Sequence, residues 1–261
     1  PPPPPPPPLS TCPPPPRRSA RLSGRQRQMC IRDSWPALKT IIEYIRPGQF
    51  DGIINTGDFT VYSTFPNKTV SWFRKQKNML CILGNTDRRL LNILEGKKLK
   101  KPGKEEKRVM YFWTAEHLSK KNHRYLKSLP EKMECIIKKT RIGIFHGTSD
   151  DPEETLYPDA PIKRFRELAR NAPYQVHIMG HSHIPYYKQV DGVHFVNPGS
   201  AGRMYDGDPR TSFAIVKVSS KSIAAEHFRI PYPVGRVTAD LEKQNLPAIY
   251  KKMYEIGKKL N

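Results

Sequence analysis

The sequence has no run of apolar residues long enough to cross a bilayer, and it contains few cysteines. Its four cysteines, Cys12, Cys30, Cys81 and Cys135, form neither a Cys-x-x-Cys pair nor a regular framework, which favours a reducing compartment. The first residues are basic but include no apolar segment of the kind that secretory signals need, so we expect no such signal there. We therefore expect a cytoplasmic protein with no membrane partner.

Acidic residues are scarce, since 24 Asp and Glu stand against 45 Lys and Arg, for a formal charge of +21. The excess is concentrated in two segments. Residues 1–34 carry six arginines against Asp33, and residues 97–108 carry seven basic residues against Glu105 and Glu106. Both segments are typical of solvated chain and not of a basic groove with interleaved aromatics. Nucleic acid is therefore not an expected partner, whereas an anionic substrate is compatible with the charge.

Residues 1–34 do not resemble part of a folded domain. Twelve of the first sixteen residues are proline, which predicts polyproline II with no core, and the Arg/Ser/Gln stretch that follows has little to bury. The join at residues 29–34 is abrupt and indicates a chimeric sequence. We therefore expect a disordered, non-native tail over 1–34 and one folded domain over 35–261.

From Trp35 onward, helical and strand patterns alternate, which predicts an α/β protein. The apolar spacing and the turn residues predict helices near 35–45, 69–76, 114–129 and 162–170. Strands are expected to end near residues 55 and 83, in a hairpin over 135–145, near 179, and at 184–190, 193–197 and 213–218. Two further helices are expected between 236 and 259, separated by Leu246-Pro247.

Four of the predicted strands end in side chains that can bind metals. These are Asp58, Asn85 with Asp87, His146, and His181 with His183. Residues i and i+2 in extended backbone point the same way, so the two last imidazoles can reach one small volume. Loops that follow the strands of open α/β sheets commonly carry functional sites. Nitrogen and oxygen ligands suit manganese, iron, nickel or zinc, so the pattern predicts a divalent metal site.

The same motifs resemble those of a known family. The series Gly57-Asp58, Gly84-Asn85-Thr86-Asp87, His146-Gly147 and Gly180-His181-Ser182-His183 is similar to that of the calcineurin-like metallophosphoesterases, in the small bacterial and archaeal phosphodiesterase-like branch. Further support comes from residues 156–159, 196–200 and 229–234. The resemblance covers about 35–261. It implies a four-layer α/β/β/α sandwich with a dinuclear metal site at the sheet edge.

The resemblance also implies roles for single residues. Asp58 would bridge two metals, Asn85, His146 and His181 would complete one site, and His183 would belong to the other. Asp87, the candidate catalytic carboxylate, would act by positioning the loop. The backbone around Gly147 and Ser200, together with Arg203, would bind phosphate. The implied reaction is hydrolysis of a small-molecule phosphate ester by a two-metal bridging hydroxide, in the manner of a phosphodiesterase or phosphatase.

Two departures from the family pattern bear on activity. Thr86 stands where many members carry a histidine that assists the leaving group. The family's first strand ends in Asp-x-His, and alignment on Pro36-Ala37-Leu38 puts Cys30 and Arg32 at those two positions. The sequence therefore predicts that the first strand is missing or replaced, and that one metal binds in place of two.

Three functional readings follow. The first is a metal-dependent phosphoesterase, and the second is a catalytically impaired protein-interaction scaffold of the same fold. The third, a DNA-repair nuclease, would need a basic cleft and additional domains. The lysine-rich segment and helix around 97–129 are expected to cover one side of the site, and the C-terminal helices are expected to pack on the sheet. The sequence does not reveal the substrate or the oligomeric state.

Overall fold

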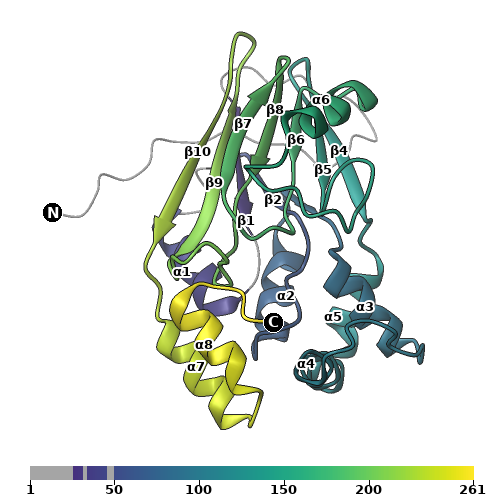
Figure 1. Cartoon of the computed structure of the whole chain (residues 1–261), viewed down its shortest axis with the longest axis vertical. Coiled ribbons are helices and arrows are strands. Elements are labelled where there is room, and N and C mark those ends of the chain that lie inside the picture. Colours follow the sequence, from purple (N-terminus) through teal and green to yellow (C-terminus); the bar gives the residue numbers. More distant parts are fainter. Residues whose placement is uncertain (1–25, 32–33, 46–49) are drawn as a thin grey trace, which may run out of the picture.

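The computed structural model describes residues 26–31, 34–45 and 50–261. The described chain forms two five-stranded sheets and the helices that cover them (Figure 1). The strands are β1 (Gln26–Ile31), β2 (Gly52–Asn55), β3 (Met79–Cys81), β4 (Lys132–Ile137), β5 (Thr140–Phe145), β6 (Val176–Ile178), β7 (Tyr186–Val190), β8 (Val193–Asn197), β9 (Thr211–Val218) and β10 (Ile223–Ile230). The helices are α1 (Trp35–Ile45), α2 (Pro66–Lys75), α3 (Asn85–Leu94), α4 (Glu105–His117), α5 (Lys120–Lys127), α6 (Ile162–Asn171), α7 (Val234–Lys243) and α8 (Ala248–Ile256).

The first sheet has the strand order β10-β9-β1-β2-β3. Strand β1 lies in its centre, parallel to β2 and antiparallel to β9. The expectation that the folded part begins at Trp35 is therefore wrong for residues 26–31, and the first strand is present. Ladder hydrogen bonds use backbone atoms, so a segment of another sequence can fill the gap between β2 and β9. The segment that fills it carries no Asp-x-His motif at its end. The predicted tail over 1–25 lies outside the described residues.

The second sheet has the order β4-β5-β6-β8-β7. Strands β5, β6 and β8 run parallel to one another, while β4 and β7 pair antiparallel at its two edges. The turn at Asn197-Pro198-Gly199-Ser200 begins the connection from β8 of this sheet to β9 of the other, which starts at Thr211. Gly199 has a φ of +79°, a conformation that favours glycine, and its N–H donates to the Asn197 side chain over 3.0 Å.

Three apolar clusters define four layers. Ile54, Leu80, Ile142, Val176 and residues of β8 and β9 pack between the two sheets. A larger cluster joins the outer face of the first sheet to α1, α2, α4, α7 and α8, and a third joins α6 to the second sheet. Successive side chains of a strand point to opposite faces of the sheet and so belong to different clusters. On β2, Ile53 faces the helices and Ile54 faces the other sheet. The predicted α/β/β/α sandwich is confirmed.

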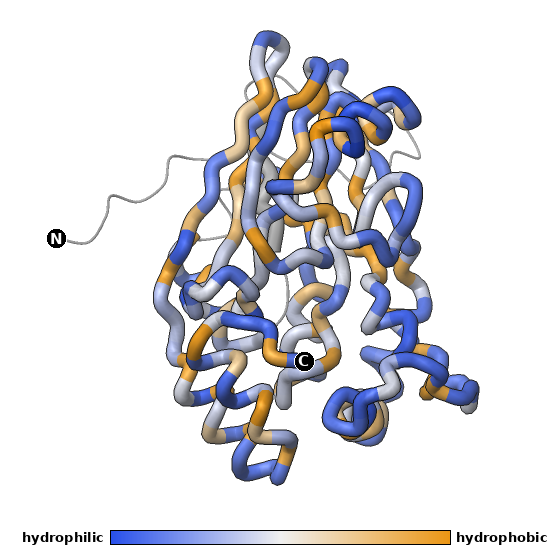
Figure 2. The backbone as a smooth tube through the Cα atoms, viewed as in Figure 1, coloured by the Kyte–Doolittle hydropathy of each residue, from blue (hydrophilic) through white to orange (hydrophobic). Residues whose placement is uncertain are grey.

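Hydropathy follows the layers. Figure 2 shows hydrophobic residues along the strands of both sheets and long hydrophilic stretches on α3, α4 and α5. Within the described ranges, no helix combines the length and the apolar character that crossing a membrane requires. Cys81 is a buried free thiol, and Cys135 is buried in the cluster between the two sheets.

The predicted elements differ from the observed ones at three places. The single helix expected over 114–129 is two helices, α4 and α5, because Ser119 caps α5 by accepting a hydrogen bond from the Asn122 N–H. Helix α2 begins at Pro66, three residues earlier than expected. Strand β10 was not predicted. It lies at the edge of the first sheet with many half-exposed positions, so its hydrophobic alternation is weak.

His177 on β6 makes the stability of the fold depend on pH. Its ring is fully buried, among Phe145, Tyr174 and Phe195, and neither ring nitrogen has a hydrogen-bond partner. Burial lowers the pKa of His177 from 6.5 to about 4. Between these values the unfolded chain binds a proton that the folded chain does not, so stability falls as the pH drops from 6.5 to 4.

We predict that His177→Phe removes about 2–3 kcal/mol of the stability loss between pH 7.5 and pH 4.5. Phenylalanine fits the same aromatic surroundings and does not titrate. The measurement is urea unfolding at both pH values, with the exposed His117→Gln variant as control. An unchanged pH dependence in His177→Phe would contradict the assignment.

Candidate metal centre

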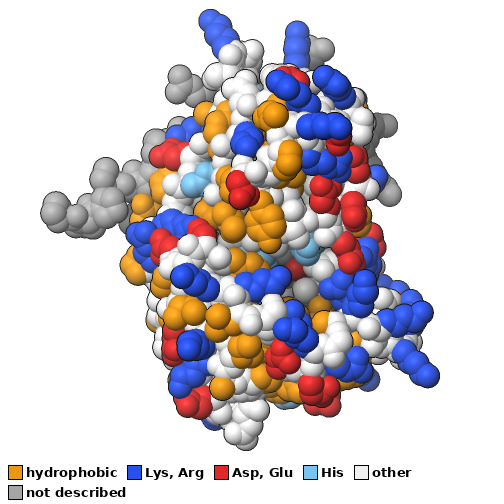
Figure 3. Space-filling model, viewed as in Figure 1, with side chains coloured by type: hydrophobic (Ala, Val, Ile, Leu, Met, Phe, Trp, Pro, Cys, Tyr) orange, Lys and Arg blue, Asp and Glu red, His pale blue; other side chains and the backbone are white. Residues whose placement is uncertain are grey.

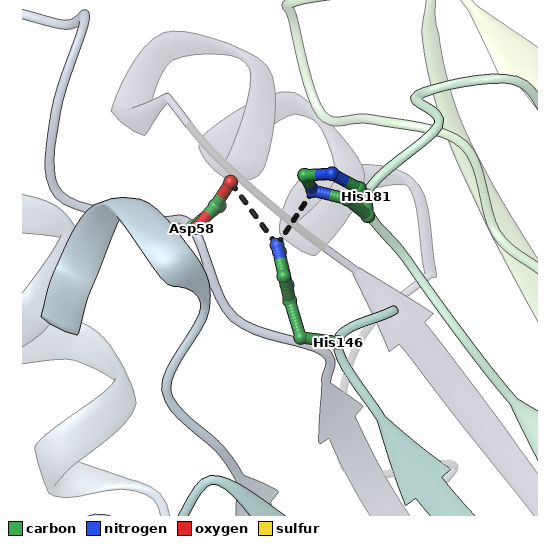
Figure 4. A group of neighbouring side chains, drawn as sticks. All are labelled: Asp58, His146 and His181. Carbon is green, nitrogen blue, oxygen red and sulfur yellow. Dashed lines mark hydrogen bonds and ion pairs between the residues drawn. The ribbon is translucent and has the colours of Figure 1, made fainter. Parts of the chain in front are cut away.

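The candidate ligands come from both sheets. Asp58 follows β2 and Asn85 begins the helix after β3, while His146 follows β5 and His181 follows β6. Because β2 and β3 run parallel, as do β5 and β6, their carboxyl ends meet at one edge of the sandwich. Figure 4 shows the side chains of Asp58, His146 and His181 pointing toward one another. Four of the residues predicted from sequence are therefore brought together.

The imidazole of His146 lies at the centre of this group. Its Nε2 lies 3.0 Å from the Asn85 Oδ1, 3.3 Å from the Asp58 Oδ2 and 3.0 Å from the His181 Nδ1. Its Nδ1 lies 2.7 Å from the carbonyl oxygen of Thr56. A carbonyl can only accept, so Nδ1 donates to Thr56, and Nε2 is the ring nitrogen that faces Asp58, Asn85 and His181.

The donor set fits a divalent cation. A carboxylate oxygen, an amide oxygen and two imidazole nitrogens converge, and one ligand atom each of Asp58, His146 and His181 lies within 4.8 Å of the others. Lone pairs that face one another repel unless a proton or a cation lies between them. The carbonyl of Thr56 fixes the orientation and tautomer of His146, as second-shell groups do for metal-binding histidines.

The backbone at the site is held in an uncommon conformation. Asp58, His181 and His183 have φ values of 61°, 62° and 57°, and Tyr62 in the same region has 73°. Residues other than glycine adopt this region rarely, and such positions cluster at functional sites. The turns that aim these side chains are therefore maintained by the surrounding contacts and not by local preference.

Two glycines allow the loops to approach closely. Gly57 has a φ of +88°, and a Cβ there would lie 2.2 Å from the Gly84 nitrogen. A Cβ on Gly84 would lie 2.0 Å from the Asp58 Oδ1. Gly57, which precedes Asp58, and Gly84, which precedes Asn85, are therefore needed for the two loops to pack against each other.

Asp87 joins these two loops. Its carboxylate accepts hydrogen bonds from the N–H groups of Asp58 (2.6 Å), Phe59 (3.2 Å) and Gly84 (3.0 Å), and from the Thr60 hydroxyl (2.5 Å). Burial raises the pKa of Asp87 and the nearby Asp58 charge raises it further, while these hydrogen bonds oppose the shift. Asp87 does not line the cavity, so its observed position is that of a positioning residue and not of one that touches substrate.

His183 lies beside the group formed by Asp58, His146 and His181. Its Nδ1 donates to the Arg203 carbonyl over 2.5 Å, and its ring stacks on Tyr205 with centroids 4.2 Å apart. A metal bound by His183 would therefore contact its Nε2. Cys30 and Arg32 stand where the family pattern has the Asp and His ligands of the second metal, and the Cys30 side chain and Arg32 lie outside the described residues.

A cavity of about 180 Å³ opens at this edge. Figure 3 shows a hollow near the middle of the drawn face with histidine at its rim and Lys and Arg side chains around it. The lining residues are Asp58, Tyr62, Asn85, Thr86, Arg89, Pro102, Lys107, Thr155, Tyr157, His181, His183, Arg203, Tyr205 and Lys259. The predicted cover by the lysine-rich segment is confirmed, because Pro102 and Lys107 line the cavity.

The three predicted phosphate-binding residues take different positions. Arg203 lines the cavity, is 7% exposed, and stacks its guanidinium 3.9 Å from the Tyr62 ring centroid. Ser200 accepts a hydrogen bond from the Arg203 N–H over 3.0 Å, and Gly147 packs beneath the backbone of residues 151–154. Neither Ser200 nor Gly147 lines the cavity, so their contact with phosphate stays a prediction.

Several lining residues were not predicted from sequence. Tyr62, Arg89, Lys107, Tyr205 and Lys259 lie far apart along the chain and belong to no motif. Lys259 also shows that the C-terminal segment does more than pack on the sheet. Two features accompany these lining residues: the positive φ of Tyr62 and the many lysines near position 107. Neither feature by itself identifies a residue of a cavity wall.

Comparison with known proteins agrees with this geometry. The sequence model of the calcineurin-like phosphoesterase superfamily domain matches residues 33–221. The chain belongs to this superfamily. An uncharacterized protein of Methanocaldococcus jannaschii is 26% identical over 83% of this chain and 91% of its own length. Membership in the calcineurin-like phosphoesterase superfamily implies hydrolase chemistry and a divalent metal, and Asp58, His146 and His181 are a group that could hold such an ion.

Two solved structures share the fold of this chain. A metallophosphoesterase from Sphaerobacter thermophilus superposes with a TM-score of 0.73 at 22% identity, covering 90% of this chain and 100% of the other. A hypothetical protein from Pyrococcus horikoshii superposes with a TM-score of 0.79 at 18% identity, covering 90% and 99%. Both span nearly the whole chain, including the second sheet.

We predict that Asp87→Asn destabilises the protein by about 2–4 kcal/mol, because an amide N–H₂ would then face backbone donors in a buried site. Thr60→Val, which removes one of the four donors, should cost only about 1 kcal/mol. Chemical denaturation of both variants is the measurement. Equal losses in the two would show that Asp87 does not hold the loops together.

Proposed function

We propose that this phosphoesterase hydrolyses a small-molecule phosphate ester with a divalent cation held by Asp58, Asn85, His146 and His181. The observation that carries the proposal is the convergence of four ligand atoms beside a cavity that also contains the buried guanidinium of Arg203. A protein-interaction scaffold would need neither feature. The enzyme reading is therefore favoured over the scaffold.

The four candidate ligands differ in the charge that they bring to the site. Asp58 supplies negative charge, while Asn85 and the two neutral imidazoles add none, so the net charge of an occupied site stays positive and attracts phosphate. When bound, divalent cations polarise phosphoryl oxygens and lower the pKa of water. Arg203 presents a planar donor that can pair with two phosphoryl oxygens. Asp58 stays in place because the Thr86 N–H donates to its Oδ1 over 2.8 Å.

Protonation of the leaving group has no assigned residue. Thr86 lines the cavity where many superfamily members carry histidine, and a hydroxyl cannot act as a general acid near neutral pH. Esters with good leaving groups, such as p-nitrophenyl esters, are therefore the substrates on which we expect activity. Manganese is a suitable first metal for the assay, since the nitrogen and oxygen ligands suit it together with iron, nickel and zinc.

We predict that the protein retains about one Mn²⁺ per chain after loading and dialysis, and that it hydrolyses bis-p-nitrophenyl phosphate slowly. His146→Ala should lose the ion and the activity, because it removes the nitrogen at the centre of the ligand group. His117→Ala, which changes an exposed histidine on α4, should keep both. Metal content by mass spectrometry checks the first part, and metal retained by His146→Ala would refute the assignment.

A second prediction concerns the replaced first strand. Strand β1 ends beside β2, with Ile31 opposite Asn55, and Asp58 follows Asn55 by three positions. Cys30→Asp combined with Arg32→His should raise the metal content toward about two ions per chain and the rate at least about tenfold. Cys30→Ala with Arg32→Ala removes the arginine charge without adding ligands and serves as control. Equal rates in the two double variants would exclude a two-metal mechanism for this chain.

A further inference from the structure

Three cations line one wall of the cavity from separate parts of the chain. Lys107 lies on α4, Arg203 follows β8, and Lys259 follows α8. Among the residues that the structure describes, none of the three forms an ion pair with a carboxylate. Arg89 on the same cavity differs, because Glu153 pairs with it over 2.9 Å. The uncompensated positive charge is therefore confined to the wall formed by Lys107, Arg203 and Lys259.

Specific contacts bring Lys107 and Lys259 together. The side-chain amide of Asn261 donates to Glu106 on α4 over 3.4 Å and to the Tyr250 hydroxyl on α8 over 3.1 Å. These contacts hold the segment after α8 against α4. Burial lowers the pKa of Lys107, and the positive charges of Lys259, Arg203 and Lys104 lower it further. The like charges are thus close enough to repel, which destabilises the protein unless an anion binds.

Tyr205 contacts both His183, beside the candidate metal centre, and Lys259. His183 covers one face of its ring at 4.2 Å, and the Lys259 ammonium lies over the ring at 5.7 Å from its centroid. The Arg203 guanidinium lies over the Tyr62 ring. The backbone carbonyl of Arg203 accepts a hydrogen bond from His183 Nδ1. Arg203 contacts His183 directly, so it is the cation that serves a phosphate at the metal centre, and Lys107 and Lys259 remain for another group.

We propose that Lys107 and Lys259 form a second anion subsite, so that the substrate is a small phosphate ester with a further phosphate or carboxylate group. The proposal rests on the proposed function, since it takes the scissile phosphate to lie at the Asp58, His146 and His181 group. The lysines and the ligand residues Asp58, Asn85 and His181 line the same cavity of about 180 Å³, so one small ester can reach both groups. The aromatic rings of Tyr157 and Tyr205 offer surfaces for such a group.

Binding of two thymidine nucleotides tests the subsite without requiring catalysis. Thymidine 3′,5′-bisphosphate and thymidine 5′-monophosphate differ by one phosphate, and calorimetry gives the affinity of the Mn²⁺-loaded protein for each. We expect the bisphosphate to bind about tenfold more tightly. Lys107→Ala and Lys259→Ala should each reduce this preference, and the double variant should abolish it. Lys259→Arg should retain it, because the charge is kept.

Lys252→Ala on the exposed side of α8 is the matched control, since it removes the same charge away from the cavity and should leave the preference unchanged. Lys107→Gln and Lys259→Gln keep most of the side-chain volume and replace any alanine variant that fails to fold. Equal affinity of the native protein for the two nucleotides, or a preference that persists in the double variant, would overturn the proposal.

Hydrolysis separates the failure of this proposal from failure of the proposed function. The substrates are the p-nitrophenyl 5′-phosphate ester of thymidine and the same ester with a 3′-phosphate. Release of p-nitrophenolate from both at equal kcat/KM would leave the phosphoesterase intact and overturn the subsite. No release from either, with the tenfold binding preference preserved, would overturn the proposed function and support the subsite.

Discussion

The buried carboxylate of Asp87 is the contact on which the candidate site depends. It accepts hydrogen bonds from the loop that carries Asp58 and from the turn that carries Asn85, and no side chain but a short carboxylate could receive all four donors there. Gly57 and Gly84 permit this approach because a Cβ on either would overlap the other loop. The positive φ angles of Asp58, His181 and His183 are then tolerated because the surrounding contacts determine them.

The sequence was sufficient for the elements whose evidence is local. Apolar strands that end in Asp58, Asn85, His146 and His181 were predictable, because strand alternation and terminal polar residues are both visible in a short window. The four-layer arrangement came from the resemblance to a family and not from periodicity. The break between α4 and α5 was missed, because the capping role of Ser119 depends on the Asn122 N–H reaching its hydroxyl.

The cavity wall could not be predicted in the same way. Lys107, Arg203 and Lys259 are separated by up to 152 positions in the sequence and meet only through the packing of α4 and α8. Nothing local distinguishes Lys259 from the lysines beside it. Strand β1 gives the converse case. No strand was predicted from the sequence of residues 26–31, yet their backbone pairs with β2 and β9. The hydrogen bonds between neighbouring strands join peptide groups, so they depend little on the side chains.

The ligand group lies where the two sheets meet, so a bound cation would affect how firmly the sheets are held together. Asp58 and Asn85 belong to the first sheet, and His146 and His181 belong to the second. A cation bound by all four would cross-link the sheets at the edge where the apolar cluster between them ends. Metal loading would then do for this sandwich what a disulfide does for a small secreted domain, restricting the separation of two layers that otherwise cohere through side-chain packing.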